Sequence, residues 1–184
     1  MKALQKILPR KKNNLKAVYL SFEGFKQVTT QALKSISLCL KKNLTKITSL
    51  SLSFRGCSGI KDEGIEYLSD SISSNLKDLK ELCLNFKGCE NLTGKCLEFL
   101  STKQALSHKN LKEIHLLFSR CKLIDEASVN MFKDKCSSAK FETILLDFDE
   151  CYQAENPIER VTFINGPKNT TKMTKSSNFR CELI

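Results

Sequence analysis

Residues 47–60 read ITSLSLSFRGCSGI, and the apolar frame of this stretch returns along most of the chain. Its members are Ile47, Leu50, Leu52, Phe54, Cys57 and Ile60. Copies displaced by 32 residues are Leu15, Val18, Leu20, Phe22, Phe25, Val28; Leu79, Leu82, Leu84, Phe86, Cys89, Leu92; and Leu111, Ile114, Leu116, Phe118, Cys121, Ile124. A fifth copy, displaced by 30 residues, is Phe141, Ile144, Leu146, Phe148, Cys151. A fixed period in this range predicts a repeat architecture.

Each copy begins with the alternation of a β-strand. Leu50, Leu52 and Phe54 alternate with polar residues, so the apolar set is expected to point into the core and the intervening set to face outward. A turn over residues 56–59 follows, and Asp62 is predicted to cap the next helix. The apolar residues of that helix lie at helical spacing, at Ile65, Leu68 and Ile72. Because a helix returns the chain across the stack, successive strands are predicted to run parallel.

The bulk composition is that of a globular chain. Its 184 residues suit one domain with a sizeable core. A hydrophobic content of 41% and a charged content of 27% are typical of soluble proteins. No apolar run reaches the ~18 residues of a membrane span. The opening MKALQKIL lacks the apolar core of a secretory signal, which favours an intracellular location.

The nine cysteines do not form a metal-binding pattern. Four lie on the repeat, at Cys57, Cys89, Cys121 and Cys151, and no C-x-x-C pair occurs. Reduced, structural cysteines are therefore expected, with no metal site and no cofactor.

The net charge of +10 is unevenly distributed. Residues 1–16 carry +6, residues 165–184 carry +3, and residues 17–164 carry the remaining +1. The chain is thus interpreted as a nearly neutral body with two basic arms. The charged residues assigned to the arms are Lys2, Lys6, Arg10, Lys11, Lys12, Lys168, Lys172, Lys175 and Arg180. Such arms favour an acidic partner, either nucleic acid, anionic lipid or an acidic protein such as tubulin; solvated tails are the alternative.

The two ends depart from the repeat. Residues 1–12 are predicted to form a short amphipathic helix that caps the first unit, with a mitochondrial presequence as the alternative. Residues 158–164 repeat the strand spacing and are predicted to form a shortened last strand. The resulting division is a basic N-terminal arm or capping helix over 1–13, a repeat domain over 14–164 and a basic tail over 165–184.

The frame L-x-x-L-x-L-x-F-x-x-C-x-x-I-x-D-x-G resembles a leucine-rich repeat. It is most similar to the cysteine-containing, ribonuclease-inhibitor-like type and to the long repeats of about 32 residues found in single-celled eukaryotes. Four departures stand out: the long period, a cysteine two residues later than usual, Gly94 at the position of Asp62 in the third unit, and Phe25 in place of the cysteine in the first unit. The resemblance implies an α/β solenoid arc, with a parallel β-sheet on the concave side, helices on the convex side, and binding through the concave face.

The outward strand positions are the candidate partner-binding residues of this face. They are Tyr19, Ser51, Arg55, Asn85, Lys87, His115, Leu117, Leu145 and Asp147. Leu117 and Leu145 form an apolar pair, while Asp147, Asp149 and Glu150 form an acidic corner. This mixture suits protein recognition and lacks the continuous basic stripe of a nucleic-acid groove.

No catalytic constellation is recognised. Cys83 and His115 are neighbours in one outward row, so a thiol–imidazole pair is geometrically possible, but no third group is identified to orient it. No P-loop or metal-ligand spacing occurs. The chain is therefore predicted to have no catalytic residues, no cofactor and no small-molecule substrate.

The functional expectation is a non-enzymatic adaptor or structural subunit that joins other protein subunits in a larger assembly. Its basic arms would contact tubulin or RNA in a microtubule-based or ribonucleoprotein complex. A substrate-recognition module of a ubiquitin ligase and a ribonuclease-inhibitor-like regulator are the alternatives. The expected location is the cytoplasm, including the cilium and cytoskeleton, with the mitochondrion as the alternative.

Overall fold

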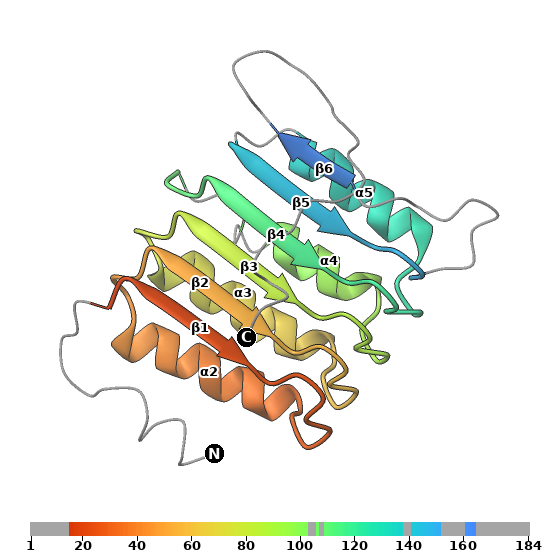
Figure 1. The fold of residues 1–184 in the computed structure, drawn as a ribbon, viewed down its shortest axis with the longest axis horizontal. Coiled ribbons are helices and arrows are strands. Elements are labelled where there is room, and N and C mark those ends of the chain that lie inside the picture. The colour runs from red at the N-terminus through yellow and green to blue at the C-terminus, as the bar shows by residue number, and fades with distance from the viewer. Residues whose placement is uncertain (1–14, 103–105, 107–108, 138–140, 152–160, 165–184) are drawn as a thin grey trace.

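Strands and helices alternate along the chain in an α/β fold (Figure 1). The structure is a computed structural model that describes residues 15–102, 106, 109–137, 141–151 and 161–164. The elements are β1 (Ala17–Ser21), α2 (Thr30–Asn43), β2 (Ser49–Ser53), α3 (Asp62–Asn75), β3 (Glu81–Asn85), α4 (Gly94–Thr102), β4 (Glu113–Leu117), α5 (Glu126–Ser137), β5 (Thr143–Asp147) and β6 (Val161–Ile164). The predicted N-terminal capping helix and the C-terminal tail lie outside the described residues.

The strands form one sheet in sequence order, from β1 to β6. Strands β1 to β5 are parallel, and residues one repeat apart are paired, as in Leu50 with Leu82 and Leu82 with Ile114. The predicted strands, their direction and their register are confirmed for these units. Each strand extends along the same path because a helix carries the chain back between strands.

The last strand runs the other way. β6 confirms a strand within 158–164, but it pairs with β5 in the antiparallel direction, so the sheet is not parallel throughout. The connection from β5 to β6 has 13 residues, against 27 between β1 and β2. A connection of half the length leaves less room for the helix-bearing return that joins parallel strands.

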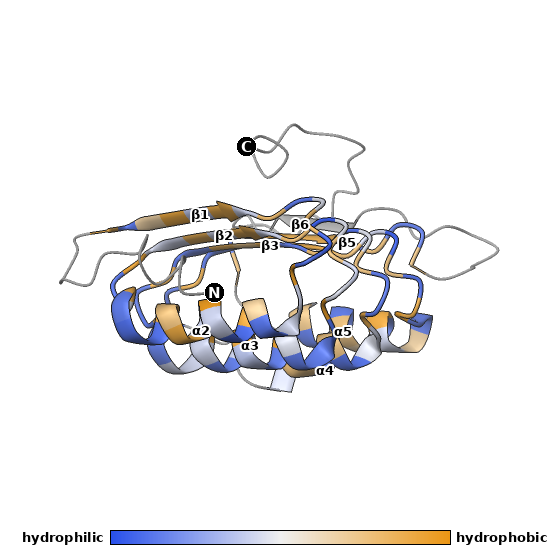
Figure 2. Cartoon of the chain, turned by 90° about the horizontal axis from the view of Figure 1, so that it is seen from below, coloured by the Kyte–Doolittle hydropathy of each residue, from blue (hydrophilic) through white to orange (hydrophobic). Residues whose placement is uncertain are grey.

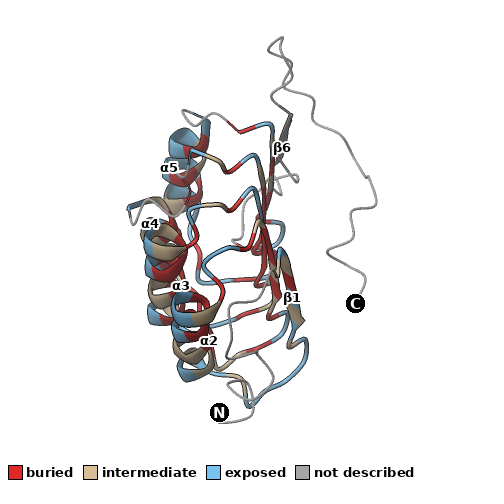
Figure 3. Cartoon of the chain, turned by 90° about the vertical axis from the view of Figure 1, so that its left-hand side faces the viewer, coloured by how far each residue is buried: buried red, intermediate tan, exposed pale blue. Residues whose placement is uncertain are grey.

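The helices cover one face of the sheet, and the apolar core lies between the two layers (Figures 2 and 3). The inward strand residues Leu50, Leu52 and Phe54 are buried, as are the helix residues Ile65 and Leu68. Burial of this apolar surface is the main favourable contribution to folding.

A row of stacked phenylalanine rings runs through the core. Phe22, Phe54, Phe86, Phe118 and Phe148 stack in that order, with ring centroids 5.3, 5.3, 5.6 and 5.7 Å apart. Every unit contributes one ring, because the strand frame places phenylalanine at the same position each time. Adjacent units are therefore joined by the same contact along the stack.

The repeat cysteines form a second ladder between units. Each thiol donates a hydrogen bond to the carbonyl oxygen of the stacked phenylalanine in the preceding unit. The pairs are Cys57 to Phe22 at 3.1 Å, Cys89 to Phe54 at 3.2 Å, Cys121 to Phe86 at 3.1 Å, and Cys151 to Phe118 at 2.9 Å. These cysteines are free and buried, as predicted for structural positions. Cys83 on the outward face is disulfide-bonded, so the expectation of reduced cysteines is wrong there.

Burial should protect the ladder thiols from modification. It raises the pKa of Cys89 to about 12 and that of Cys151 to about 12. Since the thiolate is the reactive form, we expect neither residue to be alkylated at neutral pH in the folded chain, and both to react once the chain is unfolded. Mass spectrometry after iodoacetamide treatment, with and without denaturant, measures this. Labelling of Cys89 at equal rates in both conditions would contradict the buried ladder.

The turn after each strand requires a left-handed backbone. Gly24, Gly56 and Gly88 adopt φ values of 74°, 73° and 68°, and Arg120 and Glu150 adopt 64° and 54° at the equivalent positions. Glycine takes this conformation without steric cost, whereas other residues lose about 1–2 kcal/mol. The last two turns therefore carry backbone strain that the first three lack.

Glycine substitutions should reveal this difference. We expect Gly88→Ala to lower the free energy of unfolding by about 1–2 kcal/mol. A Cβ at Gly88 has its nearest neighbour, the Gly56 Cα, at 3.9 Å, so the loss is conformational rather than steric. Arg120→Gly is the reverse change at the equivalent turn: it relieves the backbone strain but removes the exposed ion pair with Glu150, so it should cost less than Gly88→Ala. Urea denaturation of both variants tests the idea, which fails if Gly88→Ala has wild-type stability.

Asp62 does not cap its own helix. It is the first residue of α3, the N-cap is Lys61, and no side chain bonds to the cap. The Asp62 carboxylate instead accepts hydrogen bonds from the backbone amide of Thr93, at 2.9 Å, and from the Thr93 hydroxyl, at 2.7 Å. The predicted cap is thus a link between consecutive units.

Candidate functional site

The outward strand residues line up across the sheet as the sequence predicts. Pairing from β1 to β5 places Tyr19 beside Ser51, then Cys83, His115 and Leu145 in one row. The next row holds Ser21, Ser53, Asn85, Leu117 and Asp147. Backbone hydrogen bonds continue the ladder beyond the strand ends, from Gly24 to Arg55, Gly56 to Lys87, Gly88 to Ser119 and Arg120 to Asp149.

The exposure of this face changes along the sheet. Tyr19 is 56% exposed and Arg55 is exposed. Ser51, Lys87 and Leu145 are half-buried. The buried members of the predicted set are Asn85, His115, Leu117 and Asp147. The residues predicted to form one interaction face are therefore brought together, but they are most accessible at β1 and at the end of β2.

A buried ion pair spans the carboxyl ends of three strands. The Lys87 ammonium lies 3.0 Å from the Asp147 carboxylate, across β4, and their side chains are 17% and 1% exposed. Burial alone raises the pKa of Asp147. Hydrogen bonds from Ser119 and Lys87, the Lys87 charge and the Asp149 amide outweigh burial and hold this pKa below its usual value. Asp147 is therefore an ionised, paired group at neutral pH.

The predicted acidic corner is largely neutralised within the protein. Asp147 pairs with Lys87, and the Glu150 carboxylate accepts two hydrogen bonds from the Arg120 guanidinium, both at 3.2 Å. Bases from the two preceding units thus pair with two of the three carboxylates of the acidic corner, while Asp149 and Glu150 are exposed.

The Cys83 and His115 pair is not a thiolate–imidazole pair. The two residues are paired in the sheet register as predicted. Cys83 is disulfide-bonded, and burial lowers the pKa of His115, which favours the neutral imidazole. The arrangement does not supply the activated thiol that nucleophilic catalysis requires.

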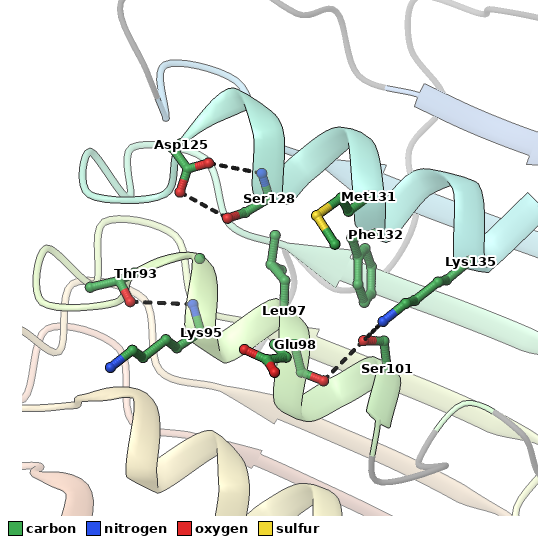
Figure 4. A pocket seen from close by; sticks show the side chains of 11 residues that line it. Thr93, Lys95, Leu97, Glu98, Ser101, Asp125, Ser128, Met131, Phe132 and Lys135 are labelled. Atoms are coloured by element: carbon green, nitrogen blue, oxygen red, sulfur yellow. Dashed lines mark hydrogen bonds between the residues drawn. The ribbon is translucent and has the colours of Figure 1, made fainter.

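The helix side carries a pocket that the repeat frame does not predict. It lies between α4 and α5, has a volume of about 410 Å³, and has Leu97, Met131 and Phe132 as its apolar lining (Figure 4). Lys95, Glu98 and Lys135 lie at its polar side, and the Lys135 ammonium is 3.2 Å from the Ser101 hydroxyl. Met131 is 63% exposed.

Gly94 shapes one end of this pocket and explains a departure from the frame. A Cβ at Gly94 would lie 1.9 Å from the Ser128 hydroxyl oxygen and 2.9 Å from an Asp125 carboxylate oxygen. Asp125 instead accepts hydrogen bonds from the amide and hydroxyl of Ser128, both at 2.8 Å, which lowers its pKa. Glycine at position 94, where the second unit has Asp62, was the feature of the sequence that pointed to the pocket between α4 and α5.

The basic arms, from Lys2 to Lys12 and from Lys168 to Arg180, lie outside the described residues. Within the described ranges, no three histidine, cysteine or acidic side chains converge in a way that would bind a metal ion. None of the described helices has the length and apolar character of a membrane span.

Comparison with known proteins gives no relative on which to base a function. No protein-family model matches the chain, and a search of curated proteins finds no match.

Proposed function

We propose that this protein is a leucine-rich-repeat solenoid arc that acts as a non-enzymatic adaptor or structural subunit of a larger assembly. The repeating frame, the alternation of strand and helix, and the parallel strands β1 to β5 are compatible with that repeat class. In this proposal the outward sheet face is the concave face and contacts protein subunits.

The observation that carries the proposal is the in-register outward face at the β1 and β2 end. Tyr19 and Arg55 are exposed there, and the half-buried Ser51 is paired with Tyr19 in the sheet register. Aromatic and arginine side chains are enriched at the energetically important positions of protein interfaces. Such a face, with side chains fixed by strand register, is preorganised for binding.

The basic arms would add contacts to an acidic partner, either a microtubule-based structure or a ribonucleoprotein. Residues 1–16 carry +6 without an acid, so their attraction to an acidic surface should weaken as salt increases.

Purification of the native complex at several salt concentrations tests both parts. We expect a defined set of proteins to co-purify with the wild-type chain in fixed proportion. The double variant Tyr19→Ala, Arg55→Ala should no longer retain these proteins. Met131→Ala changes an exposed residue on the helix side and should leave the complex intact. Deletion of residues 2–12 and 168–184 should reduce the salt sensitivity. A complex unaffected by the Tyr19 and Arg55 changes would refute the face proposed here.

A further inference from the structure

Within the part of the chain that the structure describes, β1 is an edge strand of the sheet. Among the described strands, β1 pairs only with β2. The Phe22 amide donates to the Ser53 carbonyl of β2, and the Lys16 carbonyl accepts from the Ser49 amide of β2. In a parallel ladder, alternate residues direct their backbone groups to opposite sides. The amides and carbonyls of Ala17, Tyr19 and Ser21 therefore point away from β2, toward the edge.

The same end exposes the cross-section of the core. The half-buried apolar residues packed against the core all belong to the first unit, at Leu15, Leu20, Phe22 and Val28. Phe22 begins the ring stack, while its equivalents Phe54 and Phe86 are fully buried. Phe25 is also 58% exposed. A strand added beside β1 would place alternate side chains over this apolar surface, as β2 does for the second unit.

The first described unit carries a net positive charge. Residues 15–46 contain six basic residues and one acid, Glu23, which gives +5, whereas residues 47–184 are neutral overall. Glu23 is itself paired with Arg55 at 3.2 Å. A second copy of this chain, or its own basic residues 1–14, would meet like charge at the edge. An acidic occupant would meet opposite charge.

We propose that the β1 edge binds an extended acidic segment of a partner polypeptide, which adds as a further strand. A polypeptide is favoured over RNA or lipid because only a strand supplies alternating amides and carbonyls to pair with those of β1. The fitting segment alternates apolar residues, which cover Leu20 and Phe22, with acidic residues on the outward side. These acidic residues would be attracted by Lys16, which precedes β1, and Lys26, which follows it; both are exposed. The inference deepens the proposed protein-interaction function by giving the chemistry of one partner segment.

A defined peptide tests the edge directly. The probe is a short synthetic peptide of alternating glutamate and valine, with its N-methylated form and an alternating lysine–valine peptide as controls. We expect only the first to bind the full chain, by fluorescence anisotropy, and to slow amide hydrogen exchange at Ala17, Tyr19 and Ser21. Ser21→Pro removes one outward amide, which an edge strand tolerates, and should weaken binding by up to about tenfold.

A charge reversal separates attraction at this edge from general attraction to the chain. Lys16→Glu with Lys26→Glu should weaken binding markedly, whereas Lys109→Glu with Lys122→Glu, the same charge change at exposed residues in later units, should not. Equal affinity for the two pairs, or for the N-methylated peptide, would overturn the proposal. Three other results would also overturn the proposal. They are peptide binding that occurs only after residues 1–13 are deleted, dimerisation of the chain through β1, and protection of the Ala17, Tyr19 and Ser21 amides by RNA. Because this readout uses no native partner, it can fail independently of the Tyr19 and Arg55 experiment.

Discussion

Replacement of Phe86 with alanine is expected to lower the free energy of unfolding by about 3–5 kcal/mol. Phe86 is fully buried and stacks on both Phe54 and Phe118, with centroids 5.3 and 5.6 Å away. The truncation therefore removes ring contacts on two sides and leaves a cavity where three units meet. Urea denaturation followed by circular dichroism gives the loss.

The ring stack supplies graded controls for this result. Phe22 has one ring neighbour and is half-buried, so Phe22→Ala should cost less than Phe86→Ala. Phe25 is exposed, and Phe25→Ala should change stability by less than about 0.5 kcal/mol. If the three variants lose equal stability, the stack does not hold the units together as described.

The repeat frame could predict this stack because it concerns backbone direction and burial alone. A period of 32 places Phe22, Phe54, Phe86 and Phe118 at one strand position. The alternation of apolar and polar residues along each strand assigns this position to the core. Parallel pairing then makes the rings neighbours. The cysteine ladder follows from the same regularity, since each Sγ meets the carbonyl oxygen of the unit before it.

Contacts between side chains of different units could not be predicted in this way. Asp62 has the sequence context of a helix cap, yet its carboxylate binds Thr93, which is 31 residues away. Gly94 interrupts the frame because Asp125 and Ser128 of the next unit occupy the space of its side chain. Local sequence gives the residue type, whereas the neighbouring helix decides its partner.

The outward face was predicted correctly in register, whereas its ion pairs were not predicted. Alternation places Lys87 and Asp147 on the outward side, but it contains no information on which side chains meet across two strands. The resulting ion pair neutralises Asp147, one of the three carboxylates of the acidic corner. It also makes Lys87 a stabilising residue in addition to a candidate contact residue.

Replacement of Lys87 with methionine is expected to lower the free energy of unfolding by about 3–5 kcal/mol at neutral pH. Methionine keeps much of the side-chain volume but leaves the Asp147 carboxylate, which is 1% exposed, without its 3.0 Å partner. Lys87→Met combined with Asp147→Leu should recover most of the loss, because no uncompensated charge remains. Lys46→Met removes one member of an exposed pair with Asp78 and should cost less than about 1 kcal/mol.

The pH dependence distinguishes loss of this ion pair from poor packing of methionine. In the wild type the folded pKa of Asp147 is depressed, so its contribution is complete above the unfolded pKa of about 3.9 and is lost as the pH falls through the folded value. In Lys87→Met, only the hydrogen bonds from Ser119 and the Asp149 amide oppose burial, so the pKa of Asp147 should be higher than in the wild type and protonation should relieve part of the penalty. The difference in the free energy of unfolding between the wild type and Lys87→Met should therefore narrow as the pH is lowered. Urea denaturation at a series of acidic pH values measures this difference. A difference that stays constant would mean that packing, not the charge of Asp147, causes the loss.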